Sequence, residues 1–270
     1  MLYDTHCHLN YHNNDELREI LARARDFGLT NIMQAGVRLQ DVERDVEICN
    51  LFSNDDLKIN CSVAIHPENV KEYGVMLVEK IKNNAIKSNH IIAIGETGLD
   101  THIPENEEFF DNQVKSFENH IECAVEMNLP LIVHSRGEKA IQKAIDMLCV
   151  YKKKYNINAV LHSYTGNYND AKQALDHDFF ISFSGIVTFK HADGVRDVAK
   201  KVPLNQMLIE TDAPYIAPVP MRGKQNETGF VNYTAKFLSS FLNVSYDVFC
   251  KTTTENGLRL FGEKEKTREY

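Results

Sequence analysis

Short apolar runs alternate with longer amphipathic segments along this 270-residue chain. The short runs are rich in β-branched residues and indicate strands, whereas the longer segments repeat apolar residues at spacings of three and four and indicate helices. One strand is predicted to start at Leu2, and the others are predicted at residues 31–35, 58–65, 90–94, 129–133, 159–161, 179–182 and 206–209. Helices are predicted at residues 15–27, 41–52, 70–86, 107–127, 138–155, 169–176, 191–200, 230–241 and 245–260.

The order of these elements predicts a parallel barrel. Strands recur about every 30 residues, which is the spacing of βα units with right-handed helical crossovers. Eight such units in a chain of this length favour a closed (β/α)8 TIM barrel over an open doubly wound sheet, and no glycine-rich dinucleotide fingerprint follows the first strand. We therefore predict a single α/β barrel over residues 1–262 and a charged tail over residues 263–270.

Composition supports a globular protein and narrows its setting. The chain is 43% hydrophobic and has no apolar stretch of the length that a membrane span needs. With a strand starting at Leu2, no leader segment is expected, so the cytoplasm is the expected location. None of the six cysteines forms a Cys-x-x-Cys pair, and most lie in apolar runs, so buried free thiols are predicted.

The net charge of −8 argues against a protein held to nucleic acid by a broad basic surface. It leaves room for an enzyme that acts on one phosphodiester at a time. Such a site can draw its local positive charge from bound metal ions and a few cationic side chains.

Histidine and acidic residues recur just past one predicted strand after another. They are His6, His8, His66, Glu96, His134, His162 and Asp212. Because the carboxyl ends of the strands of a parallel barrel meet at one face, this pattern predicts a metal site there. His6 and His8 are spaced to place both imidazoles on one side of a strand, whereas Cys7 between them should face away and is not expected to bind metal.

The carboxylates have the more specific expected roles. Glu96 is flanked by Gly95 and Gly98, which leave its carboxylate open to the barrel mouth, where it can bridge two divalent ions; an ordinary helix cap is the alternative. Asp212 would bind the first ion and accept the proton of an attacking water, and is with Glu96 a predicted catalytic residue.

The second ion would draw its remaining ligands from two strands. His134 and His162 follow the fifth and sixth strands and would complete its shell, while Glu210 is expected to act at most through a ligand. Imidazoles and carboxylates without a thiolate suit Zn, Mn, Co or Mg.

Four further residues are candidate contacts to an anionic substrate. His66 can donate a hydrogen bond to a phosphoryl oxygen, with a structural histidine as the alternative. Arg136 lies two residues after His134, and Arg222 and Lys224 lie in the loop after Asp212. For exposed cations, a solvated charge is the alternative.

Taken together, these segments resemble the TatD family of metal-dependent deoxyribonucleases, which are amidohydrolase-like TIM barrels. The resemblance rests on residues 4–9 (DTHCHL), 65–67 (IHP), 94–100 (IGETGLD), 129–136 (LPLIVHSR), 162–166 (HSYTG) and 210–215 (ETDAPY). It implies hydrolysis of DNA, usually as a 3′-to-5′ exonuclease on single strands, in DNA repair or degradation. It also implies two divalent ions per chain (Mg, Mn or Zn): His6, His8 and Asp212 on one, His134 and His162 on the other, and Glu96 between them. A monomer is expected.

Several positions depart from the usual family pattern. Residues 101–104 (THIP) replace aromatic residues, 163–164 (SY) replace Cys-Phe, Gly137 replaces a polar residue, and 225–228 (QNET) lose a cation and a proline. The ligand set is intact, so the departures bear on substrate contacts. Two alternatives stay open: an ester or amide hydrolase of the same superfamily, for example on an aminoacyl ester of tRNA, and an inactive barrel kept as a binding module.

Overall fold

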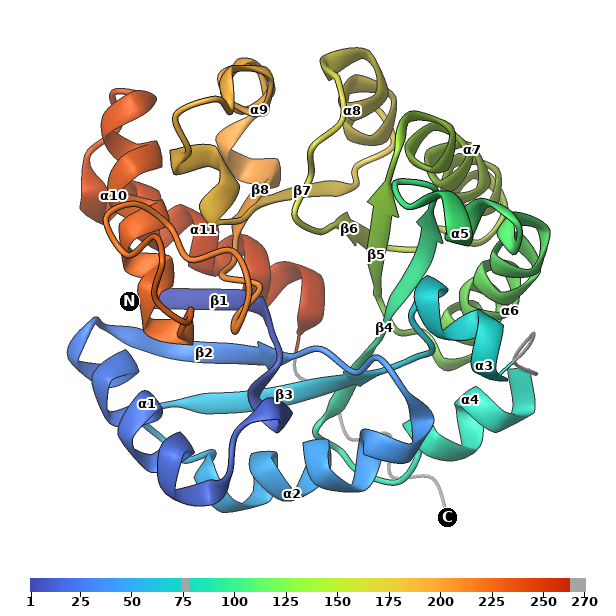
Figure 1. The fold of residues 1–270 in the computed structure, drawn as a ribbon, viewed down its shortest axis with the longest axis horizontal. Helices are drawn as coiled ribbons and strands as arrows, with labels where there is room; N and C mark the ends of the chain where they lie inside the picture. Colours follow the sequence, from blue (N-terminus) through green and yellow to red (C-terminus); the bar gives the residue numbers. More distant parts are fainter. Residues whose placement is uncertain (74–77, 263–270) are drawn as a thin grey trace.

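The structure, a computed structural model, describes residues 1–73 and 78–262. Eight strands pair in parallel and in sequence order, and helices surround them (Figure 1). The strands are β1 (Leu2–Cys7), β2 (Leu29–Gln34), β3 (Lys58–Val63), β4 (Ile91–Asp100), β5 (Leu131–Arg136), β6 (Ala159–Leu161), β7 (Phe180–Phe183) and β8 (Met207–Ile209).

The α-helices among the described residues follow the strands and cover the barrel. They are α1 (Asn14–Asp26), α2 (Val42–Phe52), α3 (Val70–Tyr73), α4 (Val78–Ala85), α5 (Pro104–Glu107), α6 (Phe110–Met127), α7 (Glu138–Tyr155), α8 (Tyr168–Leu175), α9 (Asp193–Ala199), α10 (Val231–Phe241) and α11 (Tyr246–Phe261). Short 3-10 helices, including η1 (Leu9–Tyr11) and η3 (Pro67–Asn69), lie in the loops at the ends of the strands.

The end of β1 and the segment after β8 meet and close the barrel. The backbone N–H of Asp212 donates to the carbonyl of His6 (2.9 Å), and that of His8 donates to the carbonyl of Ala213 (2.7 Å). The buried carboxylate of Asp4 accepts from the backbone N–H of Thr211 (2.8 Å). The predicted (β/α)8 TIM barrel is confirmed, with this seam between β1 and the segment after β8.

Apolar side chains form two cores. The larger core lies between the strands and the surrounding helices. The smaller one fills the inside of the barrel with residues such as Tyr3, Met33 and Phe180, and Leu260 and Phe261 at the end of α11 join it. The barrel is therefore packed inside, and space for chemistry remains only towards the ends of its strands.

Several predicted boundaries were wrong. The strand predicted at 90–94 is longer, because β4 stays paired with β5 as far as Asp100, so Glu96 lies inside the strand. The helix predicted at 107–127 starts at Phe110 and follows the separate α5, where Pro104 begins a new first turn. The helix predicted at 70–86 corresponds to α3 and α4, with residues 74–77 between them outside the described residues, and the predicted tail at 263–270 also lies outside them.

The cysteine prediction is confirmed, because all six thiols are free and buried. The Cys7 Sγ lies 3.6 Å from the carbonyl oxygen of Met33, to which it donates, and it packs in the larger core rather than with its histidine neighbours. Within the described parts of the chain, no helix is long and apolar enough to cross a membrane.

Candidate metal centre

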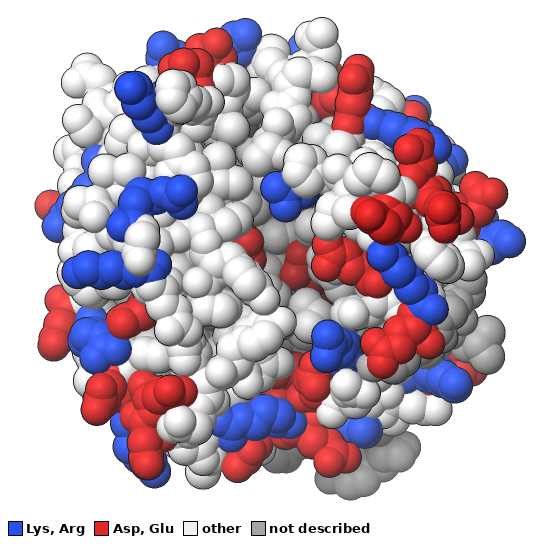
Figure 2. Space-filling view, viewed as in Figure 1, with Lys and Arg blue, Asp and Glu red and all other residues white. Residues whose placement is uncertain are grey.

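The predicted histidines and carboxylates meet in one cavity of about 510 Å³ at the carboxyl ends of the strands. Figure 2 shows a hollow near the centre of this face, with acidic side chains in and beside it. Six of the predicted histidines and carboxylates line the cavity: His8, His66, Glu96, His134, His162 and Asp212. His6 is fully buried beside them.

One oxygen of Glu96 faces a first cluster, made of His6, His8 and Asp212. The Glu96 Oε2 lies 3.2 Å from the His6 Nε2 and 3.6 Å from the His8 Nε2. The Asp212 Oδ1 lies 3.6 Å and 3.5 Å from the same two nitrogens. These ligand atoms surround a common point between β1, β4 and β8.

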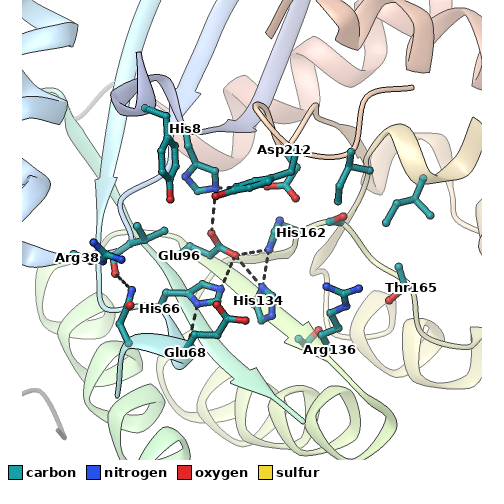
Figure 3. Close-up of a pocket in the computed structure, with 18 residues that line it drawn as sticks. His8, Arg38, His66, Glu68, Glu96, His134, Arg136, His162, Thr165 and Asp212 are labelled. Carbon is teal, nitrogen blue, oxygen red and sulfur yellow. Dashed lines mark hydrogen bonds and ion pairs between the residues drawn. The ribbon is translucent and has the colours of Figure 1, made fainter. Parts of the chain in front are cut away.

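The other oxygen of Glu96 faces a second cluster of imidazoles (Figure 3). The Glu96 Oε1 lies 2.7 Å from the His162 Nε2, 2.9 Å from the His134 Nδ1 and 3.2 Å from the His66 Nε2. Glu96 is 3% exposed and stands between the two clusters, one oxygen towards each. This is the arrangement that a bridging carboxylate requires.

The spacing of the nitrogens fits metal chelation. Two nitrogens at about 2.0–2.1 Å from one tetrahedral ion lie about 3.3–3.4 Å apart. The Nε2 atoms of His6 and His8 are 3.3 Å apart, and the His134 Nδ1 is 3.2 Å from the His162 Nε2. Each pair therefore matches two neighbouring positions of a coordination shell, and the residues fit a site for divalent ions.

Hydrogen bonds at the far side of three imidazoles leave the near nitrogen free to bind metal. The His8 Nδ1 donates to the carbonyl of Ala35 (3.1 Å) and the His162 Nδ1 to Glu210 (3.2 Å). The His134 Nε2 donates to Asp100 (2.9 Å). With the proton held on the far nitrogen, the near nitrogen presents its lone pair to the cavity.

His6 and His66 differ from these three. The buried His6 Nδ1 has no hydrogen-bond partner among the described residues. The His66 Nδ1 accepts a hydrogen bond from the backbone N–H of Glu68 (3.2 Å). A neutral imidazole that accepts at one nitrogen carries its proton on the other, so the His66 Nε2 faces Glu96 as a donor. His66 is thus suited to donate a hydrogen bond, and its Nε2 also lies near enough to atoms of Glu96 and His134 for the three to surround an ion.

Electrostatic interactions with the surrounding imidazoles lower the pKa values of the two carboxylates. Burial alone would raise the pKa of Glu96, but the imidazoles of His162, His66 and His6 lower its pKa well below the ordinary value. Burial would also raise the pKa of Asp212, and the neighbouring imidazoles of His8, His6 and His162 lower it. Both carboxylates are therefore ionised at neutral pH, as metal ligands must be.

In the second cluster, by contrast, the pKa values of the imidazoles are raised. Burial would lower the pKa of His162, but the carboxylates of Glu96 and Glu210 raise its pKa well above the ordinary value. His134 is raised in the same way by Asp100 and Glu96, against burial. Any ion that binds these nitrogens must compete with protons.

Of the three predicted cationic contacts, one lines the cavity and two do not. Arg136 lines the cavity as predicted, and Arg38 lines it without having been predicted. The two flank the cluster in Figure 3, and the buried Arg38 Nε has no hydrogen-bond partner in the described part of the chain. Neither Arg222 nor Lys224 is among the described residues that line the cavity, and the Arg222 guanidinium lies 4.0 Å above the ring of Phe189.

Comparison with known proteins places this geometry in a family. The sequence model described as TatD related DNase matches residues 3–262 of the chain. The chain belongs to the TatD family. It is a TatD-family metal-dependent hydrolase, and the resemblance noted from the sequence is confirmed.

Curated relatives span almost the whole chain. It is 32% identical to the uncharacterized metal-dependent hydrolase YabD of Bacillus subtilis (strain 168), over 97% of this chain and 99% of the relative. It is 35% identical to the uncharacterized metal-dependent hydrolase YcfH of Escherichia coli (strain K12), over 96% and 95%.

A solved structure shares the fold. YJJV, a TatD homolog from Escherichia coli K12, superposes with a TM-score of 0.84 at 22% identity, covering 96% of this chain and 97% of that one. At this identity the likeness supports the barrel and carries no argument about the substrate.

Proposed function

We propose that this TatD-family hydrolase cleaves phosphodiester bonds of DNA as a 3′-to-5′ exonuclease on single strands, with two divalent ions (Mg, Mn or Zn) per chain. The observation that carries the proposal is Glu96, whose two oxygens each face a separate cluster of ligand atoms. The description of the family as TatD related DNase supports a DNA substrate.

Each cluster would hold one ion. His6, His8 and Asp212 would bind the first, His134 and His162 the second, and Glu96 both. Divalent ions at these positions supply Lewis acidity, which lowers the pKa of water and offsets charge on a phosphoryl group.

The side chains of this chain perform the remaining steps. The ionised carboxylate of Asp212 accepts the proton of the water that attacks phosphorus, and the bond to the leaving oxygen breaks on the opposite side. The His66 Nε2 donates a hydrogen bond to a phosphoryl oxygen as negative charge grows there. Arg136 and Arg38 contact phosphates next to the one that is cleaved. Arg222 lies outside the cavity and contacts only a longer DNA substrate.

Digestion of an end-labelled single-stranded oligonucleotide tests the proposal. With Mg or Mn, we expect a ladder that shortens from the 3′ end and vanishes with chelator. Glu96→Ala should lose bound metal and activity together, and Asp212→Asn should lose activity by at least about a hundredfold while keeping a folded barrel. Glu43→Ala, an exposed carboxylate on α2, is the matched control.

Two outcomes would count against this assignment. Full activity of Asp212→Asn would remove Asp212 as the base. A metal-loaded, folded wild-type protein that leaves DNA intact would redirect the search to ester or amide substrates.

A further inference from the structure

Two tyrosines stand at the mouth of the metal cavity with their rings partly in water. Tyr11 is 55% exposed and Tyr215 is 49% exposed, and both line the cavity. Their rings meet edge to face, with centroids 5.9 Å apart and planes at 78°. We call this pair the tyrosine wall.

The tyrosine wall adjoins the first ligand cluster. The centroids of Tyr11 and Tyr215 lie 6.1 Å and 6.3 Å from that of His8, and both rings meet the imidazole edge to face. His8 in turn faces Glu96 and Asp212. A group attached next to a phosphate held by this cluster would therefore lie beside the two rings.

The same segments that carry the ligands hold the wall in place. Tyr11 ends η1, which follows β1 and its histidines. The backbone N–H of Tyr215 donates to the carbonyl of Asp212 (2.9 Å), and the fully buried Asn226 side chain donates to the carbonyls of Tyr215 and Thr211. The backbone of Tyr215 is therefore held by bonds within the chain, and that of Tyr11 follows closely on the ligand residues of the first cluster.

We propose that the tyrosine wall binds the unpaired nucleobase next to the phosphate that is cleaved. This inference rests on the proposed function and gives that site a preference among nucleic acids. Exposed aromatic rings stack on bases of any identity, since every base has a π-face. A base inside a duplex is already stacked and paired, so only a single strand or a frayed end offers a free face to the wall.

The test compares alanine and phenylalanine variants of Tyr11 and Tyr215. The double alanine variant should raise the KM for a single-stranded oligonucleotide about tenfold to a hundredfold, in line with the loss of base stacking, and bind metal as the wild type does. The double phenylalanine variant keeps the rings and should stay close to the wild type. Tyr155→Ala removes a tyrosine that is 44% exposed and stacks on Tyr151 of α7, and serves as the control.

A 3′-terminal 2-aminopurine gives an independent signal, because stacking on a ring quenches its fluorescence. Metal-loaded Asp212→Asn should quench it, and adding the two alanine substitutions should abolish the quenching. If the wild type cleaves DNA and the double alanine variant has an unchanged KM, the tyrosine wall does not bind the base, and the nuclease assignment stands. If the wild type does not cleave DNA, quenching that the alanines remove would still support the wall, and absence of binding would overturn both.

Discussion

Each cavity histidine has a near nitrogen whose role depends on the partner of its far nitrogen. Carboxylates hold the far protons of His134 and His162, so both near nitrogens face Glu96 as acceptors. A backbone N–H points at the far nitrogen of His66, which makes its near nitrogen a donor. Under the proposed function, histidines at the same barrel mouth would thus divide into metal ligands and a substrate contact.

Replacing two of these histidines should show the difference. His162→Ala should lose about one ion per chain, because it removes a ligand. His66→Ala should keep its metal and lose about tenfold to a hundredfold in kcat/KM, and His66→Gln, which still has an N–H donor, should recover part of it. Metal content is read by elemental analysis of protein equilibrated with Mn or Zn. Loss of an ion from His66→Ala would mean that His66 is a ligand.

The sequence could single out these candidate ligands because each lies just past a recognisable apolar run. It did not predict the partners of those residues. Asp100 meets His134 only because Gly98 lies opposite His134 and Asp100 opposite Arg136 in the paired strands, a register that spacing along the chain does not reveal. Arg38, Tyr11 and Tyr215 were missed for the same reason, since nothing local distinguishes them from other surface residues.

At the level of secondary structure, the contact between β4 and β5 depends on glycine. Gly98 has a φ of +144°, and a Cβ there would collide with the carbonyl oxygen of His134. This close approach places the Glu96 strand against the His134 strand. A side chain at position 98 would force the two strands apart or rotate them.

Gly98→Ala is therefore expected to reduce both stability and metal binding. We expect a loss of about 3 kcal/mol in the free energy of unfolding, from steric overlap and an unfavourable backbone conformation. Gly194→Ala in α9 is the matched control, because a Cβ there meets nothing within 4 Å and alanine favours the helix. Urea denaturation and metal titration of both variants make the comparison. Equal stability of the two would show that the strands adjust freely.

Strand order was predictable from the alternation of elements, but the direction of side chains within a strand was not. Strict alternation would put Tyr3 and Cys7 on the same side of β1, yet Tyr3 packs inside the barrel and Cys7 in the outer core. The pairing of β1 with β2 shifts register between Asp4 and Cys7, which accounts for the change. Such an irregularity depends on the neighbouring strand and leaves no pattern in the sequence.

For the molecule as a whole, the acidic balance is compatible with the proposed substrate because two arginines line the cavity and bound ions would offset the charge of its carboxylates. The net charge is −8, but Arg38 and Arg136 both line the cavity. The charge count left open an enzyme that acts on one phosphodiester, which stays a prediction. It could not say where the cations would gather.

Stability of the whole fold should depend on pH through His120, a buried residue of α6. Its Nδ1 donates to the carbonyl of Ser116 (2.7 Å), and its Nε2 accepts from the backbone N–H of Ile65 (3.0 Å). Burial lowers its pKa to about 4. In the unfolded chain, the pKa of a histidine is about 6.5. The contribution of His120 to the free energy of unfolding is therefore fully present above that pH and falls by about 3 kcal/mol as the pH drops towards 4.

Comparison with His120→Gln isolates this contribution from those of the carboxylates. Urea unfolding at several pH values between 7 and 4.5, all with chelator, gives the free energy for each protein. The free energy of unfolding of the wild type, relative to that of His120→Gln, should decrease as the pH falls, whatever the difference at pH 7. Parallel curves would show that His120 does not titrate as described.

The seam that closes the barrel joins residues from opposite ends of the chain, and the first ligand cluster lies on it. His6 lies in β1 and His8 directly after it, and the backbone N–H of Asp212 donates to the His6 carbonyl. An ion shared by these three would act as a clasp, fastening the first strand to the segment after the last. Because this site exists only in the folded chain, binding of the ion would raise the free energy of unfolding by mass action. If the chain were cleaved between His8 and Asp212, this ion would still join the two fragments.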